Sequence, residues 1–145
     1  MTALLAPALI ALFSFLLRIY HLGSINKFIF DEVYYVDGAR DLIKYGVEVS
    51  GSRPEFVVHP PLGKWLIGIG IQLFGDNGFG WRIVTALIGS LSIFIIGLIA
   101  HKLFYSTFLT ALASALMAVD GLALVHSRTA LLDNFLAFFI LVAAY

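Results

Sequence analysis

The sequence predicts an all-α, polytopic membrane protein with about four transmembrane helices. Of its 145 residues, 61% are hydrophobic and only 12% are charged, whereas a soluble domain averages about a quarter charged. The mean hydropathy is +0.98, and seven of the nine acidic residues fall within one segment, residues 20–80. Apolar runs flank this polar segment, which indicates membrane spans separated by a large loop outside the bilayer.

The composition also excludes several classes of protein. Lys and Arg together number nine, as do Asp and Glu, so no polybasic surface points to nucleic acid. The sequence has no cysteine, which excludes disulfides, thiol catalysis and thiolate metal sites. No Lys or Arg precedes the first apolar run and no small-residue cleavage site follows it, so we expect a retained span instead of a cleaved signal.

The first predicted span covers about residues 3–19. It is apolar from Ala3 to Leu17 apart from Ser14, and Arg18 closes it. With its flanking residues it offers roughly twenty positions, about the length that a helix needs to cross a bilayer.

The polar segment, residues 20–80, is predicted to be a large loop outside the bilayer and to contain two short helices. The first covers residues 31–45, and Gly46 provides its stop. The second includes the apolar residues 65–74 and follows the pair Pro60-Pro61. At about 1.5 Å per residue it is too short to cross a hydrocarbon core about 30 Å thick, so we expect it to lie in the interface.

Three further spans are predicted at about residues 82–101, 108–125 and 129–145. The first of them is apolar throughout its body and ends at His101-Lys102. Asp120 interrupts the second near its far end. The third is still apolar where the sequence stops. We therefore expect residues 1–145 to form the N-terminal part of one larger membrane domain.

The number of predicted spans places the polar residues at one face of the membrane. If residues 65–74 do not cross, the loop and the polar island around Arg128 lie on the same side, and Lys102 lies on the other. If they did cross, the two groups would separate. The excess of Lys and Arg in the loop would instead favour the cytoplasm, but at about 60 residues the loop is at the limit of that rule. The residues gathered in this way are Asp31, Glu32, His59, Lys64, Arg82, Asp120, Arg128 and Asp133.

The adjacent carboxylates Asp31 and Glu32 have two interpretations. Asp31 would cap a helix, with Glu32 adding charge near its positive end, or a carboxylate at this interface would act as general base on a hydroxyl. One such pair is a weak signal for a metal, and no metal site is predicted.

The other charged candidates also allow a structural and a functional interpretation. Lys64 would extend to water or meet a phosphate, while the prolines after His59 fix the loop. Arg82 and Arg128 lie at span ends, where they would reach water or bind phosphate through two parallel hydrogen bonds. Asp133 lies about one turn beyond Arg128 and would be its partner.

Four motifs occur in the order found in one known family. They are residues 30–35 (FDEVYY), 58–67 (VHPPLGKWLI), 79–82 (FGWR), and Asp120-Gly121 followed by residues 127–133 (SRTALLD). With these motifs the sequence resembles the protein O-mannosyltransferases, especially the actinobacterial-type enzymes that use polyprenyl-phosphate mannose. The two-residue Asp-Glu is a weak signal, whereas the HPPLGK and SRTALLD runs are specific. The resemblance implies the N-terminal region of a GT-C-type glycosyltransferase, with residues 20–80 as its first extracytoplasmic loop. The family has many more spans than this chain.

The resemblance also implies an inverting transfer of mannose from polyprenyl-phosphate mannose to Ser or Thr hydroxyls of secreted or membrane proteins. The site would face outward from a multi-pass protein of the cell membrane, and remaining spans of the same enzyme would complete it. No cofactor is implied, and dependence on a divalent metal stays open. By this resemblance Asp31 is the base and Glu32 orients the acceptor or the base. His59 and Lys64 lie near sugar or phosphate, Arg82 and Arg128 stabilise the leaving phosphate, and Asp133 orients Arg128.

Two alternatives remain at this point. One is another polyprenyl-phosphate sugar transferase that acts on a lipid or a glycan. The other is a non-catalytic membrane module whose charges only pair with one another.

Overall fold

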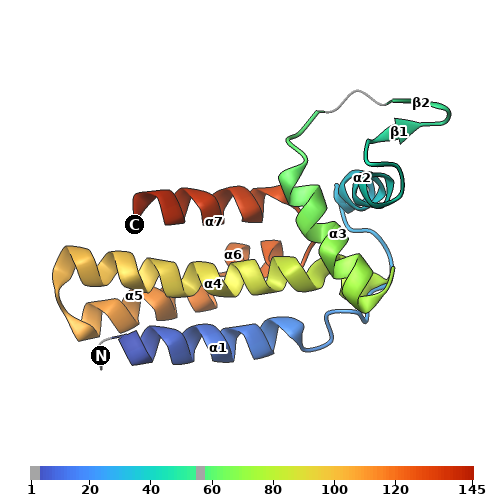
Figure 1. Ribbon diagram of the computed structural model, residues 1–145. Coiled ribbons are helices and arrows are strands. Elements are labelled where there is room, and N and C mark those ends of the chain that lie inside the picture. Colours follow the sequence, from blue (N-terminus) through green and yellow to red (C-terminus); the bar gives the residue numbers. More distant parts are fainter. Residues whose placement is uncertain (1–3, 55–57) are drawn as a thin grey trace.

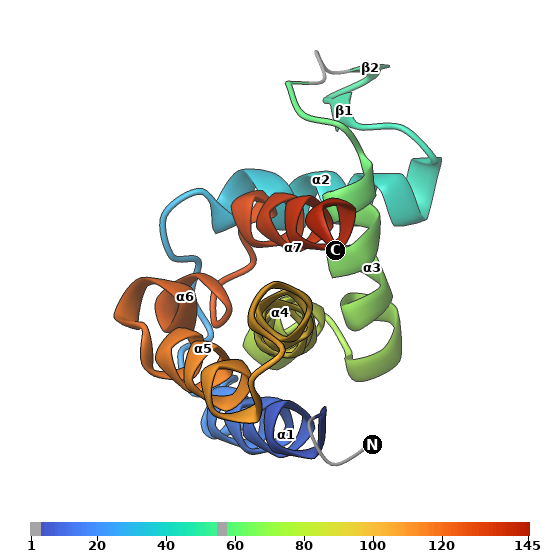
Figure 2. The same cartoon turned by 90° about the vertical axis from the view of Figure 1, so that its left-hand side faces the viewer.

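A computed structural model describes residues 4–54 and 58–145 of the protein, and it places helix α4 at the centre of a helical bundle. Helices α1, α3, α5 and α7 pack around α4 (Figures 1 and 2). Helix α2, the β1–β2 hairpin and α3 lie at one end, opposite to the end where α1 begins and α7 finishes (Figure 1). The described elements are α1 Leu5–Ile19, α2 Glu32–Tyr45, β1 Val49–Ser50, β2 Arg53–Pro54, α3 Leu62–Phe74, α4 Gly78–Phe104, α5 Thr107–Val119, α6 Gly121–His126 and α7 Leu132–Ala144.

Both short helices predicted in the polar loop are confirmed. Helix α2 ends where Gly46 adopts a left-handed conformation with φ 75°, as a C-terminal glycine allows. Helix α3 begins directly after Pro61 and has 13 residues, about 20 Å at 1.5 Å per residue. It is too short to cross a hydrocarbon core about 30 Å thick, as predicted.

The predicted span at residues 108–125 is wrong as one continuous helix. The chain leaves the helical conformation at Asp120, with φ −62° and ψ 123°, so that α5 ends at Val119 and α6 begins at Gly121. The Asp120 carboxylate accepts the Ala123 N–H at 2.7 Å and so caps α6. The predicted span at residues 129–145 is shorter than expected, since turns precede Leu132, where α7 begins.

Within the described residues, α4 alone is long and apolar enough to cross a membrane by length and composition. It has 27 residues and contains the predicted span 82–101, whereas α1, matching the prediction at residues 3–19, has 15 described residues. Residue 3 lies outside the described ranges. Helix length therefore does not establish the predicted count of four spans.

The crossing of α3 and α4 depends on two glycines. A Cβ at Gly70 would lie 2.3 Å from the Gly80 carbonyl oxygen, and a Cβ at Gly80 would lie 2.0 Å from the Gly75 carbonyl oxygen. Real Cβ atoms do not approach backbone oxygens so closely. The glycines of this segment thus serve close helix packing, which fixes α3 against the start of α4.

Replacing Gly70 with Ala is expected to lower the free energy of unfolding by about 1–3 kcal/mol, the usual cost of overpacking. The opposing group is backbone, so α3 must shift away from α4. Gly121→Ala is the matched control, because a Cβ there meets nothing within 4 Å. Thermal unfolding of both variants in detergent tests this expectation, and equal stability of the two would contradict it.

Candidate active site

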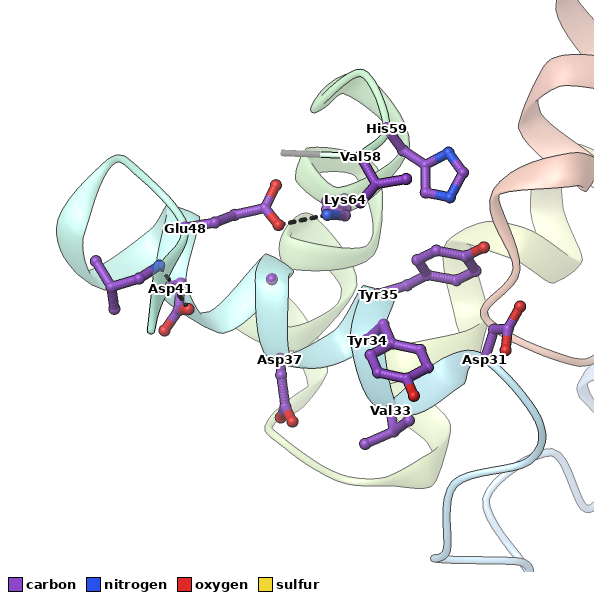
Figure 3. A pocket seen from close by; sticks show the side chains of 12 residues that line it. Asp31, Val33, Tyr34, Tyr35, Asp37, Asp41, Glu48, Val58, His59 and Lys64 are labelled. Atoms are coloured by element: carbon purple, nitrogen blue, oxygen red, sulfur yellow. Dashed lines mark hydrogen bonds and ion pairs between the residues drawn. The ribbon is translucent and has the colours of Figure 1, made fainter. Parts of the chain in front are cut away.

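A cavity of about 520 Å³ lies at the polar end of the bundle, between α2, the segment before β1, and the start of α3 (Figure 3). Three of the predicted site residues, Asp31, His59 and Lys64, line it. The cavity therefore brings together residues that are more than 25 positions apart in the sequence. Folding must close the loop between them, at a cost in chain entropy that grows only slowly with loop length.

Asp31 occupies the N-cap position of α2 but does not act as a cap. Its side chain makes no capping hydrogen bond, and the contacts found among residues 4–54 and 58–145 give its carboxylate neither a hydrogen-bond donor nor an ion-pair partner. The preceding residue, Phe30, has φ 55°, a conformation that bulky residues rarely adopt. The half-buried carboxylate is thus held at the cavity wall with its oxygen atoms available.

Lys64 is buried and forms an ion pair with Glu48 across the cavity wall (Figure 3). Their side chains are 5% and 6% exposed. A buried ammonium needs an opposite charge to offset its lost hydration. The amine of Lys64 therefore does not extend to water, which was the structural alternative for this residue.

Tyr35 lies beside His59 and lines two cavities. Its ring makes an edge-to-face contact with the ring of His59, with 5.6 Å between centroids. Both residues also line a second, more apolar cavity of about 400 Å³ between α3 and α7, which Asp133 borders. Burial raises the pKa of Tyr35 above its ordinary value, and the charges of Asp31 and Asp133 raise it further, so the hydroxyl stays protonated at neutral pH.

Glu32 and Arg82 form a buried pair beside the cavity instead of lining it. Arg82 Nε donates to Glu32 Oε1 at 2.7 Å and Nη2 donates to Oε2 at 2.6 Å. The remaining guanidinium N–H groups point to the carbonyl oxygens of Leu22, Ile25 and Lys27. Every donor of Arg82 thus faces a protein oxygen, so in this arrangement none is free for the predicted contact with the leaving phosphate.

The carboxylate of Glu32 is 0% exposed and joins three segments. Besides Arg82 it accepts the backbone N–H groups of Ile29 and Ala130, at 2.8 and 2.7 Å. Glu32 therefore holds the turn before α2 against α4 and against the turn before α7. It cannot contact a substrate in this arrangement, so it can orient Asp31 only through the backbone of α2.

Arg128 caps the end of α1. Its guanidinium donates to the carbonyl oxygens of Leu17, Arg18 and Tyr20 at 2.9–3.0 Å. The predicted ion pair between Arg128 and Asp133 is absent from the described residues, whose four ion pairs involve other side chains.

Sequence reasoning placed Asp31, His59 and Lys64 together but did not single out Glu48 and Tyr35, which also line the cavity. Glu48 lies two residues after Gly46 in a stretch without a motif, and only its pairing with Lys64 singles it out. Tyr35 belongs to the FDEVYY run, yet no pattern distinguished it from Tyr34, which is exposed. Among the residues that the structure describes, no group of three or more His, Asp or Glu side chains is placed to hold a metal ion.

The fold and site are those of a mostly helical, strongly apolar protein with a carboxylate- and lysine-lined cavity at one end of its bundle. Two family models, both described as dolichyl-phosphate-mannose-protein mannosyltransferase, match residues 58–145 and residues 8–81. The chain belongs to this family of membrane mannosyltransferases, as its motifs predicted.

Curated relatives carry related names. A polyprenol-phosphate-mannose–protein mannosyltransferase of Mycobacterium tuberculosis is 41% identical over 145 residues, which cover 96% of this chain and 27% of the relative. The protein of that name from Corynebacterium glutamicum is 42% identical over 147 residues, covering 95% and 28%. The chain thus spans just over a quarter of the length of these relatives.

A more distant relative acts on a different sugar according to its name. The undecaprenyl phosphate-alpha-4-amino-4-deoxy-L-arabinose arabinosyl transferase 2 of Pseudomonas fluorescens is 35% identical over 99 residues, which cover 67% of this chain and 18% of the relative. No solved structure shows a significant match to the chain.

Proposed function

We propose that the chain forms part of an enzyme that transfers mannose from polyprenyl-phosphate mannose to Ser or Thr hydroxyls of proteins. The observation that carries this proposal is the Asp31 carboxylate, which has no partner among residues 4–54 and 58–145 and lies at the wall of a cavity of about 520 Å³, in a chain of the mannosyltransferase family. A cavity of this size is within the range of small-molecule sites.

In the proposed reaction Asp31 acts as general base. It accepts the proton of the acceptor hydroxyl while that oxygen attacks the anomeric carbon of mannose. The bond between this carbon and the phosphate oxygen breaks, and the lipid phosphate leaves with the electron pair. Attack from the opposite side inverts the configuration at the anomeric carbon.

The remaining residues support this step in distinct ways. His59 lines both cavities and Asp133 borders the second, where the sugar and its phosphate would enter. The ammonium of Lys64 supplies positive charge in the cavity wall, where it favours the charge that develops on the leaving phosphate. Glu32, Arg82 and Arg128 act as positioning residues, because their contacts are to protein groups.

The proposal places the site at the outer face of the cell membrane in a multi-pass protein. In this topology α1, α4, the α5–α6 pair and α7 provide four membrane crossings of a GT-C-type domain, and α2 and α3 lie in the first extracytoplasmic loop. The donor reaches the site from the bilayer, and secreted or membrane proteins present their hydroxyls from outside.

The test is a transfer assay with the complete membrane assembly in lipid nanodiscs. Polyprenyl-phosphate mannose and a Ser/Thr-rich peptide are supplied, and mass spectrometry is expected to show mannose on the peptide. A peptide with Ala in place of Ser and Thr is the control and stays unmodified. Transfer of the sugar only to a lipid or a glycan would favour the arabinosyl transferase-like alternative. Absence of transfer and of donor binding would favour a non-catalytic module.

A further inference from the structure

Glu48 has a feature that its ion pair with Lys64 does not explain. Only Oε2 contacts the Lys64 amine, while Oε1 is buried and finds no hydrogen-bond partner among the residues described, 4–54 and 58–145. Figure 3 shows this second oxygen on the side of the carboxylate that faces away from the amine. A buried carboxylate oxygen without a donor is costly.

The local fold holds Glu48 in this position. The next residue, Val49, donates its backbone N–H to the Asp41 carboxylate at 3.1 Å, which fixes the chain leading into β1 against α2. Gly38 leaves room for the pair, because a Cβ there would lie 2.9 Å from Glu48 Oε2 and 3.0 Å from Lys64 Cδ. Helix, hairpin and glycine thus all place one carboxylate in the wall of the cavity.

The chemistry of Glu48 Oε1 determines which kind of ligand group it can bind. An ionised carboxylate is only an acceptor of hydrogen bonds, and it repels a phosphate. A neutral hydroxyl is the complementary group, and the cavity that Glu48 lines also contains Asp31 and Lys64. A sugar that is bound beside a phosphate offers several such hydroxyls.

We propose that Glu48 Oε1 accepts a hydrogen bond from a ring hydroxyl of the donor sugar, so that Glu48 determines sugar specificity while its other oxygen positions Lys64. This inference rests on the proposed function, in which the cavity receives a lipid-linked mannose. Glu48 takes no part in proton transfer, and no bond to it forms or breaks.

The test compares Glu48→Gln with the native residue in the complete membrane assembly. Donors are polyprenyl-phosphate mannose and its 2-, 3-, 4- and 6-deoxy forms. Glu48→Gln is expected to raise KM for the mannose donor by about 10- to 100-fold, as for loss of a hydrogen bond to a charged group, with the KM for the acceptor unchanged. One deoxy donor is expected to show almost no further loss in this variant, because it lacks the hydroxyl that Glu48 binds.

The controls separate this role from a structural one. Asp76→Asn removes an exposed carboxylate that lines neither cavity and pairs with Arg40, and is expected to leave the KM for every donor unchanged. If Glu48→Gln does not fold, Glu48→Asp keeps the charge opposite Lys64 and shortens the side chain, so the same comparison is made with it. If the variant raises KM equally for mannose and for all deoxy donors, Glu48 is structural. If only the KM for the acceptor changes, its oxygen binds the acceptor hydroxyl. Either result overturns the inference.

Donor binding without acceptor distinguishes failure of this inference from failure of the proposed function. If the native protein binds polyprenyl-phosphate mannose and Glu48→Gln binds it equally well, the inference fails and the function stands. If the native protein binds no polyprenyl-phosphate mannose, the proposed function fails, and the Glu48 inference falls with it.

Discussion

Asp31→Asn is expected to lower kcat for mannose transfer by about 10²–10⁴-fold, the usual contribution of a general base. The amide is nearly the same size as the carboxylate but cannot accept the proton of the attacking hydroxyl. Because the described structure gives the Asp31 carboxylate no capping bond and no ion pair, the substitution removes chemistry without removing a contact. Initial rates at saturating donor and acceptor, at matched amounts of folded protein, measure the effect.

The control for this prediction is Asp76→Asn, in the turn between α3 and α4. Asp76 is exposed, pairs with Arg40 and lines neither cavity, so its loss is expected to leave kcat within about twofold, in keeping with the small effect of surface ion pairs. Equal rates for Asp31→Asn and the native protein would place the base elsewhere and would refute the assignment of Asp31.

Replacing one partner of the Glu32–Arg82 pair is expected to lower the free energy of unfolding by about 3–5 kcal/mol. Arg82→Met leaves the fully buried Glu32 carboxylate without its cation, and it also frees the carbonyl oxygens at the end of the loop after α1. Glu32→Gln leaves the guanidinium uncompensated and weakens the bond from the Ala130 N–H. Chemical unfolding in detergent, followed by circular dichroism, measures both changes.

This second experiment also decides between the two roles of Arg82. Asp37→Asn is the control for stability, because the exposed pair of Asp37 with Arg40 contributes at most about 1 kcal/mol. If Arg82→Met kept full stability and lost only donor binding, Arg82 would contact the leaving phosphate, as the family resemblance implied, and the structural role would be wrong.

The helices were predictable because their signals are local. Apolar runs, the glycine after Tyr45 and the prolines before Leu62 mark α2 and α3 within a few residues. The polar residues were predicted to lie at one membrane face because α3 is too short to cross the bilayer. A helix that does not cross leaves the chain on the side from which it came. These inferences need only the reach and hydropathy of each segment.

Partnerships across the sequence were not predictable in the same way. Glu32 and Arg82 are 50 positions apart, and nothing in either neighbourhood tells that the two charges neutralise each other. Adjacent acids therefore suggested a joint catalytic role for Asp31 and Glu32, whereas successive positions of a helix point about 100° apart. One of these carboxylates faces the cavity and the other faces the protein interior.

The bond between the Ala130 N–H and Glu32 also sets an order for biosynthesis. Translation delivers Glu32 first, Arg82 50 residues later, and Ala130 98 residues after Glu32. A chain synthesised only as far as α4 contains Glu32 and Arg82 but lacks the third segment that this carboxylate joins. The turn before α2 can therefore reach its final contacts only after Ala130 has been synthesised, although the proposed base Asp31 is made about a hundred residues earlier.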